Sequence, residues 1–127
     1  MMKTLFAGLV VSTLALGAFQ AVAATAEPAA MGDTAKGKIL VNAKGMALYS
    51  FDKDAAGKSN CNGKCATEWP PLKAAADSKA SGDWTVVARD DGSKMWAYKG
   101  QPLYTFVDDK KAGDVTGDNK DGFHIVM

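Results

Sequence analysis

Gly45-Met-Ala-Leu-Tyr-Ser-Phe-Asp-Lys-Asp54 is the stretch that decides the fold, because it returns in the second half of the chain as Gly100-Gln-Pro-Leu-Tyr-Thr-Phe-Val-Asp-Asp109. The glycine, leucine, tyrosine, phenylalanine and final aspartate are identical in the two copies, and serine is exchanged for threonine. Two copies are too few for a solenoid, which needs about three repeats to bury its faces. We therefore expect an internal duplication within one domain, with repeat motifs at residues 45–54 and 100–109.

Each copy has the pattern of a glycine-containing turn, a short strand and an acidic stop. Alternation along a strand places Tyr49 and Phe51 on one face and Leu48 on the other. Tyr104 and Phe106 repeat this arrangement in the second copy.

The recurring aromatic and acidic residues have two interpretations. Tyrosine and phenylalanine two positions apart on a strand are typical of core packing, and an aspartate just after a strand often closes a turn by bonding its own backbone. The alternative is a platform of exposed rings that stacks on a ligand, with the aspartates at its rim. The residues concerned are Tyr49, Phe51, Asp54, Tyr104, Phe106 and Asp109.

Further strands are expected around the two motifs. The turn signal Asp90-Asp91-Gly92 separates two of them, and Lys99-Gly100 turns the chain into the second motif. Only residues 63–69 have a helical pattern, which Pro70-Pro71 must end. We therefore expect a mainly β domain, a small antiparallel β-meander or sandwich-like domain from two related repeats, with one short helical turn near the cysteines. The expected strands cover residues 39–42, 84–89, 94–98 and 123–127.

The only cysteines, Cys61 and Cys65, are separated by Asn-Gly-Lys. In an oxidising compartment so close a pair is typical of a small disulfide loop, and Asn62-Gly63 supplies its turn. A redox pair more typically has two intervening residues, a zinc site needs further ligands, and covalent haem attachment needs a histidine where Ala66 stands. We predict a structural disulfide, which contributes about 2 kcal/mol because the loop is short.

The chain begins with the pattern of an exported protein. Residues 1–23 combine an early lysine, an apolar stretch and an Ala-Val-Ala exit, which is typical of a secretory signal peptide. Residues 24–36 are rich in small residues and are expected to form a flexible leader. The folded domain is therefore expected over residues 37–127.

The charge balance excludes two classes of partner. Lys+Arg 15 against Asp+Glu 14 leaves the chain nearly neutral, and loss of Lys3 with the signal peptide makes the two equal. A neutral protein has no electrostatic basis for holding nucleic acid or an anionic membrane. Beyond the signal peptide no apolar run approaches the roughly 20 residues of a membrane-spanning helix. We expect a soluble protein with no stable membrane anchor.

Two segments near the C-terminus carry metal-ligand residue types. His124 and Met127 offer an imidazole and a thioether, which are copper ligands, with Met46 or Met95 as further candidates. Residues three apart on a strand point to opposite faces, however, and a lone histidine is more often structural. Residues 114–122 are rich in oxygen ligands and glycine, which suits calcium, but they lack the order of an EF-hand loop. We predict no cofactor, with copper and calcium as the alternatives.

No enzyme signature is present in the sequence. There is no Gly-x-Ser-x-Gly elbow and no glycine-rich phosphate loop, and one histidine leaves little room for a histidine-based triad. A hydrolase that uses Asp54 and Asp109 as paired carboxylates is conceivable, but nothing in the pattern requires it. We therefore predict a protein without catalytic activity.

With both motifs and the segment Cys61-Asn-Gly-Lys-Cys65-Ala-Thr-Glu-Trp69-Pro-Pro-Leu72, the chain resembles a bacterial secreted-repeat family described as predicted lipoproteins with a Tyr-x-(Phe/Trp/Tyr)-x-x-Asp motif. The resemblance covers residues 37–127 and implies an exported envelope protein built from paired repeats. The family is known chiefly as one of unknown function, so the resemblance implies no activity. No cysteine near Ala23 is available to accept a lipid, which favours a free periplasmic protein.

Together these observations predict a periplasmic or secreted protein that acts as a non-enzymatic binding or interaction module. Its partner would be a small molecule or another envelope protein. One alternative is a periplasmic copper-binding protein that uses His124 and methionines. The other is a carbohydrate or cell-wall binder that uses the rings of Tyr49, Trp69 or Tyr104.

Overall fold

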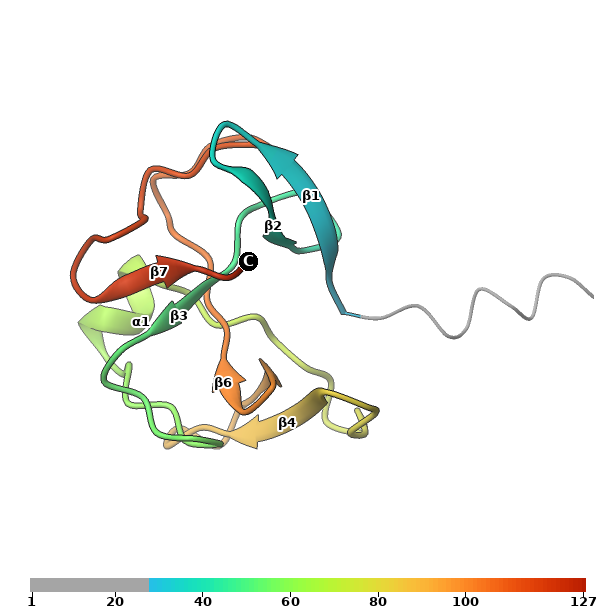
Figure 1. Ribbon diagram of the computed structural model, residues 1–127. Coiled ribbons are helices and arrows are strands. Elements are labelled where there is room, and N and C mark those ends of the chain that lie inside the picture. The colour runs from blue at the N-terminus through green and yellow to red at the C-terminus, as the bar shows by residue number, and fades with distance from the viewer. Residues whose placement is uncertain (1–27) are drawn as a thin grey trace, which may run out of the picture.

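The computed structural model describes residues 28–127, and the predicted signal peptide lies outside these residues (Figure 1). The described part is mainly β, with short antiparallel strands and one short helix beside the disulfide, as the sequence predicts. Its three small sheets have the strand orders β1-β2, β3-β7 and β4-β5-β6. The elements are β1 (Ala30–Thr34), β2 (Gly37–Val41), β3 (Tyr49–Phe51), α1 (Lys64–Glu68), β4 (Trp84–Ala88), β5 (Lys94–Tyr98), β6 (Gln101–Pro102) and β7 (Phe123–Ile125).

The predicted turn and the predicted helix end both lie where the structure changes direction. β4 and β5 form the predicted hairpin, whose turn is closed by the bond from the Arg89 N–H to the Ser93 carbonyl. Gly92 has a φ of 88° in this turn, a left-handed conformation that favours glycine. Helix α1 ends at Glu68 with Trp69 as its C-cap, directly before Pro70-Pro71, because proline disfavours a helical conformation in the residue that precedes it.

The expectation of a flexible leader over residues 24–36 needs correction, because β1 lies within it. β1 pairs along its whole length with β2, from Ala30 opposite Val41 to Thr34 opposite Gly37. Most of its side chains are exposed, so this strand is held by its backbone ladder more than by apolar burial. A prediction from bulky apolar residues therefore misses it.

The two copies are related by an approximate twofold arrangement centred on Tyr49 and Tyr104. The backbones of these two residues exchange both hydrogen bonds, Tyr49 N–H to Tyr104 carbonyl at 2.7 Å and the reverse at 2.9 Å. Neighbouring bonds occur in equivalent pairs: the Leu48 N–H bonds the Leu40 carbonyl, and the Leu103 N–H bonds the Trp96 carbonyl. The repeated sequence therefore forms a repeated structure.

Each copy ends by pairing with the other copy. β7, from the end of the second copy, lies alongside β3 of the first, with Ser50 opposite His124 (Figure 1). In the equivalent place the Leu72 N–H, from the end of the first copy, bonds the Leu103 carbonyl of the second. Neither copy has a complete set of strand partners by itself, so the two halves must fold together.

A stack of four aromatic rings fills the centre of the core. Trp69 and Phe123, at equivalent positions in the two copies, stack with centroids 3.8 Å apart. Phe106 stacks on the outer face of Trp69 and Phe51 on the outer face of Phe123, each at 4.2 Å. Aromatic rings bury large apolar areas and gain further from ring–ring contact. This stack again joins residues of different copies.

The predicted alternation of faces is confirmed. Tyr49, Tyr104 and Phe106 belong to the core cluster around the ring stack. Leu48 and Leu103 point the other way, into a second cluster that contains Leu40, Trp84 and Ala29. β3 and its equivalent segment therefore lie between two apolar clusters, and Leu48, Tyr49, Leu103 and Tyr104 are fully buried.

Candidate functional site

The recurring tyrosines and aspartates bind across the copies. The Tyr104 hydroxyl donates to Asp54 Oδ2 at 2.7 Å, and the Tyr49 hydroxyl donates to Asp109 Oδ2 at 2.6 Å. Each tyrosine thus reaches the aspartate of the other motif. We call this arrangement the joint, with a Tyr104 end (Tyr104 and Asp54) and a Tyr49 end (Tyr49 and Asp109).

Burial sets the protonation of the joint. Removal from water, followed by the hydrogen bond to the facing carboxylate, raises the pKa of both tyrosines well above the usual value, so each phenol remains a donor. Burial also raises the pKa of Asp54, although Tyr104 and the Asn60 N–H bond its carboxylate and oppose the shift. Both phenols therefore stay protonated at neutral pH and can donate to the facing aspartates.

The Tyr104 end continues into a buried polar network that no pattern in the sequence indicates. Ser59 Oγ lies 2.5 Å from the Tyr104 hydroxyl, and Arg89 Nη1 donates to the same Ser59 oxygen at 3.0 Å. Arg89 Nη2 donates to the Cys61 carbonyl at 2.8 Å, and the whole residue is only 6% exposed. A buried arginine is tolerable only when its N–H groups have acceptors, which this network provides.

The predicted disulfide is present, joining Cys61 and Cys65. Cys61 is fully buried in the core cluster. Its carbonyl receives Arg89 from the second copy, so the disulfide loop of the first copy is attached to the second. The loop therefore belongs to the Tyr104 end of the joint.

The Tyr49 end uses different neighbours. Asp109 Oδ1 accepts from the Thr116 N–H at 2.8 Å and from the Thr116 hydroxyl at 2.6 Å. The Gly117 N–H donates to the Tyr49 hydroxyl at 3.2 Å. A Cβ on Gly117 would lie 2.6 Å from the Trp69 ring, so only glycine fits here. Within residues 28–127, none of the hydrogen bonds at this end involves an arginine.

Burial of the motif corrects one expectation. The exposed fractions of Tyr49, Trp69 and Tyr104 are 0%, 1% and 0%. These rings present no face to a ligand, so the aromatic platform and the carbohydrate alternative based on these three rings are not supported. The closing aspartates also do not act as simple turn residues, because their side chains reach across the joint.

His124 is held between two oxygen atoms. Its Nε2 lies 2.8 Å from Asp52 Oδ2, and its Nδ1 lies 2.8 Å from Asn119 Oδ1. Met127, the other predicted copper ligand, has 76% of its surface exposed. Both ring nitrogens of His124 therefore already have partners within the chain.

Two carboxylates of the acidic segment 114–122 also have hydrogen-bond partners elsewhere in the chain. Asp114 accepts from the backbone of Lys110 and Lys111, and Asp118 accepts from Lys36 and from the Ile125 N–H. Within residues 28–127, no group of three or more histidine, cysteine, aspartate or glutamate side chains is placed to hold a metal ion.

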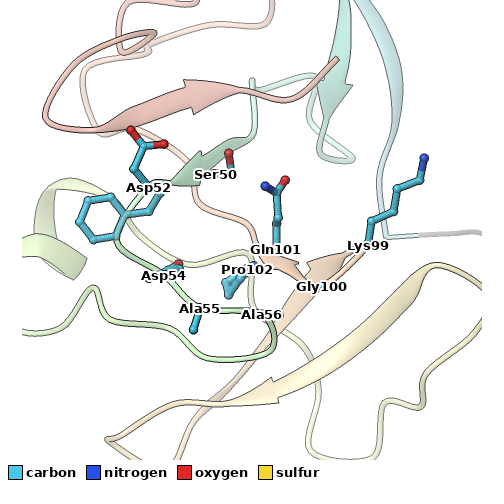
Figure 2. Close-up of a pocket in the computed structure, with 10 residues that line it drawn as sticks. Ser50, Asp52, Asp54, Ala55, Ala56, Lys99, Gly100, Gln101 and Pro102 are labelled. Atoms are coloured by element: carbon cyan, nitrogen blue, oxygen red, sulfur yellow. The ribbon is translucent and has the colours of Figure 1, made fainter.

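A polar pocket of about 310 Å³ opens above the Tyr104 end, where the two copies meet (Figure 2). The first copy contributes β3 and the residues after it, and the second contributes the turn that leads into β6. Figure 2 shows the side chains arranged around one opening, with Lys99 on the side away from Asp52. The lining residues are Ser50, Phe51, Asp52, Asp54, Ala55, Ala56, Lys99, Gly100, Gln101 and Pro102.

Two polar side chains of the pocket have no partner. The Ser50 hydroxyl and the Gln101 amide form no hydrogen bond with any other residue in the range 28–127, whereas Asp52 bonds His124 and Asp54 bonds Tyr104. A hydroxyl and an amide can each both donate and accept. Both groups therefore remain available to a ligand.

The equivalent face at the Tyr49 end has a different chemistry. Alignment of the two motifs places Met46 where Gln101 stands, and Val107 where Asp52 stands. Val107 is 41% exposed, and Met46 is half-buried. Asp52 and Gln101 therefore differ in polarity from their counterparts, whereas Ser50 is exchanged for another hydroxyl residue, Thr105, and Asp54 of the joint is the same in both copies.

The repeat motif predicts Asp54 and Phe51 as site residues, but its pattern does not indicate Ser50, Asp52 or Gln101. For Asp52 and Gln101 the signal is the position-by-position difference between the copies, which becomes informative once the structure shows that most of the identical residues are buried.

Comparison with known proteins gives one match. A family model described as a secreted repeat of unknown function matches residues 30–73 and 85–126, together more than half of the chain. No curated protein and no solved structure matches. In residues 28–127 no helix is long and apolar enough to cross a membrane. The two matched segments coincide with the two interlocked copies, and the chain belongs to the family of secreted repeats of unknown function.

Proposed function

We propose that this protein is a periplasmic, non-enzymatic binding module that holds a small polar molecule in the pocket above the Tyr104 end. The observation that carries the proposal is the pocket itself, with a hydroxyl and an amide that have no partner within the described chain. Ligand sites are typically concave, formed before binding, and equipped with a few convergent polar groups.

The sequence difference between the two copies also supports a ligand site at the pocket. The joint needs Leu, Tyr, Phe and Asp in both copies, because these side chains fill the core and bind across it. The exposed positions above it have no such requirement. Gln101 and Asp52 are polar, whereas their counterparts Met46 and Val107 are apolar. Such a difference is expected when only one of the two surfaces holds a ligand.

The arrangement of the carboxylates favours binding over hydrolysis. Paired carboxylates divide acid and base roles only when both face the same bond of the substrate. Asp54 and Asp109 instead bind separate tyrosines at the two ends of the joint. Each is therefore committed to a structural hydrogen bond.

The compartment is part of the proposal. The family is secreted, the cysteines are joined in a disulfide, and such bonds persist in oxidising compartments. Mass spectrometry of protein from an osmotic-shock fraction tests it: we expect a denatured mass that begins at residue 24, with an oxidised cysteine pair. Recovery of the uncleaved chain from the cytoplasm would contradict it.

The binding function is tested by nuclear magnetic resonance with ¹⁵N-labelled protein. A panel of small polar compounds of neutral, cationic and anionic character is added in turn. We expect at least one to shift the backbone signals of Ser50 and Gly100 and the side-chain amide of Gln101. Signals of the equivalent face, Gly45 and Thr105, serve as the internal control. If no compound shifts the pocket signals more than the control signals, the binding function is wrong.

A further inference from the structure

We infer that the ligand is a neutral hydroxylated ring of about one sugar unit, a proposal that rests on the binding function above. Three features of the pocket carry it: the position of its charges, its unpaired polar groups and its apolar wall.

The charges disfavour an anion. The carboxylates of Asp52 and Asp54 line the pocket. Lys99 is the cationic lining residue, but its Nζ lies 5.3 Å from the centroid of the Tyr98 ring, which is itself not part of the lining. Arg89 is buried behind Asp54, where Ser59 and the Cys61 carbonyl engage it. A phosphate or carboxylate would therefore meet negative charge without a cation directed at it.

The same carboxylates give little advantage to a cation, because each already has hydrogen-bond donors. Asp52 Oδ2 contacts His124, and Asp54 accepts from the Tyr104 hydroxyl and from the Asn60 N–H at 2.6 Å. A cation gains most from a carboxylate that lacks other partners. The pocket thus offers carboxylate acceptors that already have hydrogen-bond partners within the chain.

The unpaired groups match sugar hydroxyls. Ser50 Oγ and the Gln101 amide can each donate and accept, and Asp52 Oδ1 is a further acceptor with no hydrogen bond to another residue in 28–127. A hydroxyl also donates and accepts, so a ring that carries several of them can satisfy all three groups. A purely apolar ligand would leave them buried without partners, which is costly.

The remaining lining suits the C–H face of such a ring. Phe51, Pro102 and Ala55 form apolar parts of the wall, and Phe51 is fixed by its stacking on Phe123. An aromatic ring in a fixed position is a good surface for the apolar side of a ligand. The volume of about 310 Å³ is at the lower end for ligand pockets, which fits one ring better than a chain of several.

A matched set of pyranoses tests the inference with the full folded protein. Glucose, glucosamine and glucuronate have the same size and are neutral, cationic and anionic; galactose, mannose and N-acetylglucosamine extend the neutral arm. Binding is followed by the ¹⁵N shifts of Ser50, Gly100 and Gln101. We expect at least one neutral sugar to bind about tenfold more tightly than glucosamine and glucuronate, the effect of about one well-formed hydrogen bond.

Two matched variants locate the site. Gln101→Leu removes the amide of an exposed pocket residue and should weaken the sugar about tenfold. Met46→Leu changes the equivalent position at the Tyr49 end and should leave the affinity unchanged. Unfolding curves like that of the unaltered protein confirm that both variants are folded.

The outcomes separate the inference from the function it rests on. Tighter binding of glucosamine, of glucuronate or of a compound that is not a sugar would overturn the neutral-sugar inference and leave the binding function standing. Equal loss of sugar binding in both variants would place the sugar elsewhere and overturn the inference as well. Absence of any shift at the pocket with all compounds would overturn both.

Discussion

The two ends of the joint have the same central pair and different surroundings. At the Tyr104 end the phenol–carboxylate pair is connected to Ser59, a buried arginine and the disulfide loop, and a polar pocket lies above it. At the Tyr49 end Thr116 and Gly117 complete the network, and Met46 and Val107 stand at the positions equivalent to pocket residues. The repeated residues therefore hold the copies together, and the residues that differ give each end its own chemistry.

The largest expected effect comes from the ring stack that both ends share. Trp69→Ala should destabilise the protein by about 3–5 kcal/mol, because it removes the ring between Phe123 and Phe106 and leaves a large cavity. Phe123→Ala should have a comparable effect. Urea unfolding followed by far-ultraviolet circular dichroism measures both. A loss below about 1 kcal/mol for either would show that the stack is not the common centre of the two ends.

The second effect should distinguish the ends. Arg89→Met keeps an unbranched side chain of similar reach but leaves the Cys61 carbonyl without its donor, and should cost about 2 kcal/mol. At the other end Thr116→Val removes a hydroxyl that is partly accessible to water, and should cost about 1 kcal/mol or less. Equal losses in the same unfolding assay would indicate that the buried arginine does not make the Tyr104 end different.

Alkaline pH should weaken both ends together. The pKa of Tyr49 and of Tyr104 is raised in the folded state, so above the ordinary value of 10.0 the unfolded chain loses these protons first. Stability is therefore unaffected by these groups below about pH 10 and falls as the pH rises beyond it. The variant Tyr98→Phe leaves only Tyr49 and Tyr104 as tyrosines. Its tyrosinate absorbance should appear only with the loss of circular dichroism; an earlier appearance would show that the hydroxyls are accessible.

The smallest expected effect is the contribution of Asp54 to the pH dependence of stability. The pKa of Asp54 is raised by burial, so the folded protein binds this proton more tightly than the unfolded chain does. Stability from this group is therefore greatest below its unfolded value of 3.8 and falls as the pH rises through the folded pKa. Asp54→Asn should flatten this part of the pH profile, with a change of about 1 kcal/mol or less. Urea midpoints measured from pH 3 to pH 7 that show the same slope with and without Asp54 would contradict it.

The sequence predicts the parts of the fold that depend on local pattern. Alternation gives the correct faces of Tyr49, Phe51 and Leu48, because a strand side chain can point only to one side or the other. Pro70-Pro71 correctly predicts where α1 ends. The close spacing of Cys61 and Cys65, together with the expected oxidising compartment, correctly predicts the disulfide. β1 is missed because its pairing depends on backbone bonds, with few buried side chains to mark it.

The candidate site is less accessible to sequence reasoning, because it depends on which copy each side chain meets. Periodicity places Tyr104 on a face but does not show that it binds Asp54 rather than Asp109 of its own motif. Arg89 is the last residue of a predicted strand and precedes a turn, a position typical of an exposed arginine. Only the three-dimensional crossing of the copies buries it beside Ser59 and creates the pocket above.

The most direct test of the cross-copy joint is a pair of double-mutant cycles. Tyr104→Phe is combined with Asp54→Ala, its partner in the other motif, and separately with Asp109→Ala, the aspartate of its own motif. Urea unfolding gives the coupling free energy of each pair. We predict a coupling of about 1 kcal/mol for Tyr104 with Asp54 and additivity, within about 0.5 kcal/mol, for Tyr104 with Asp109. Coupling of Tyr104 with Asp109 and additivity with Asp54 would contradict the crossed joint.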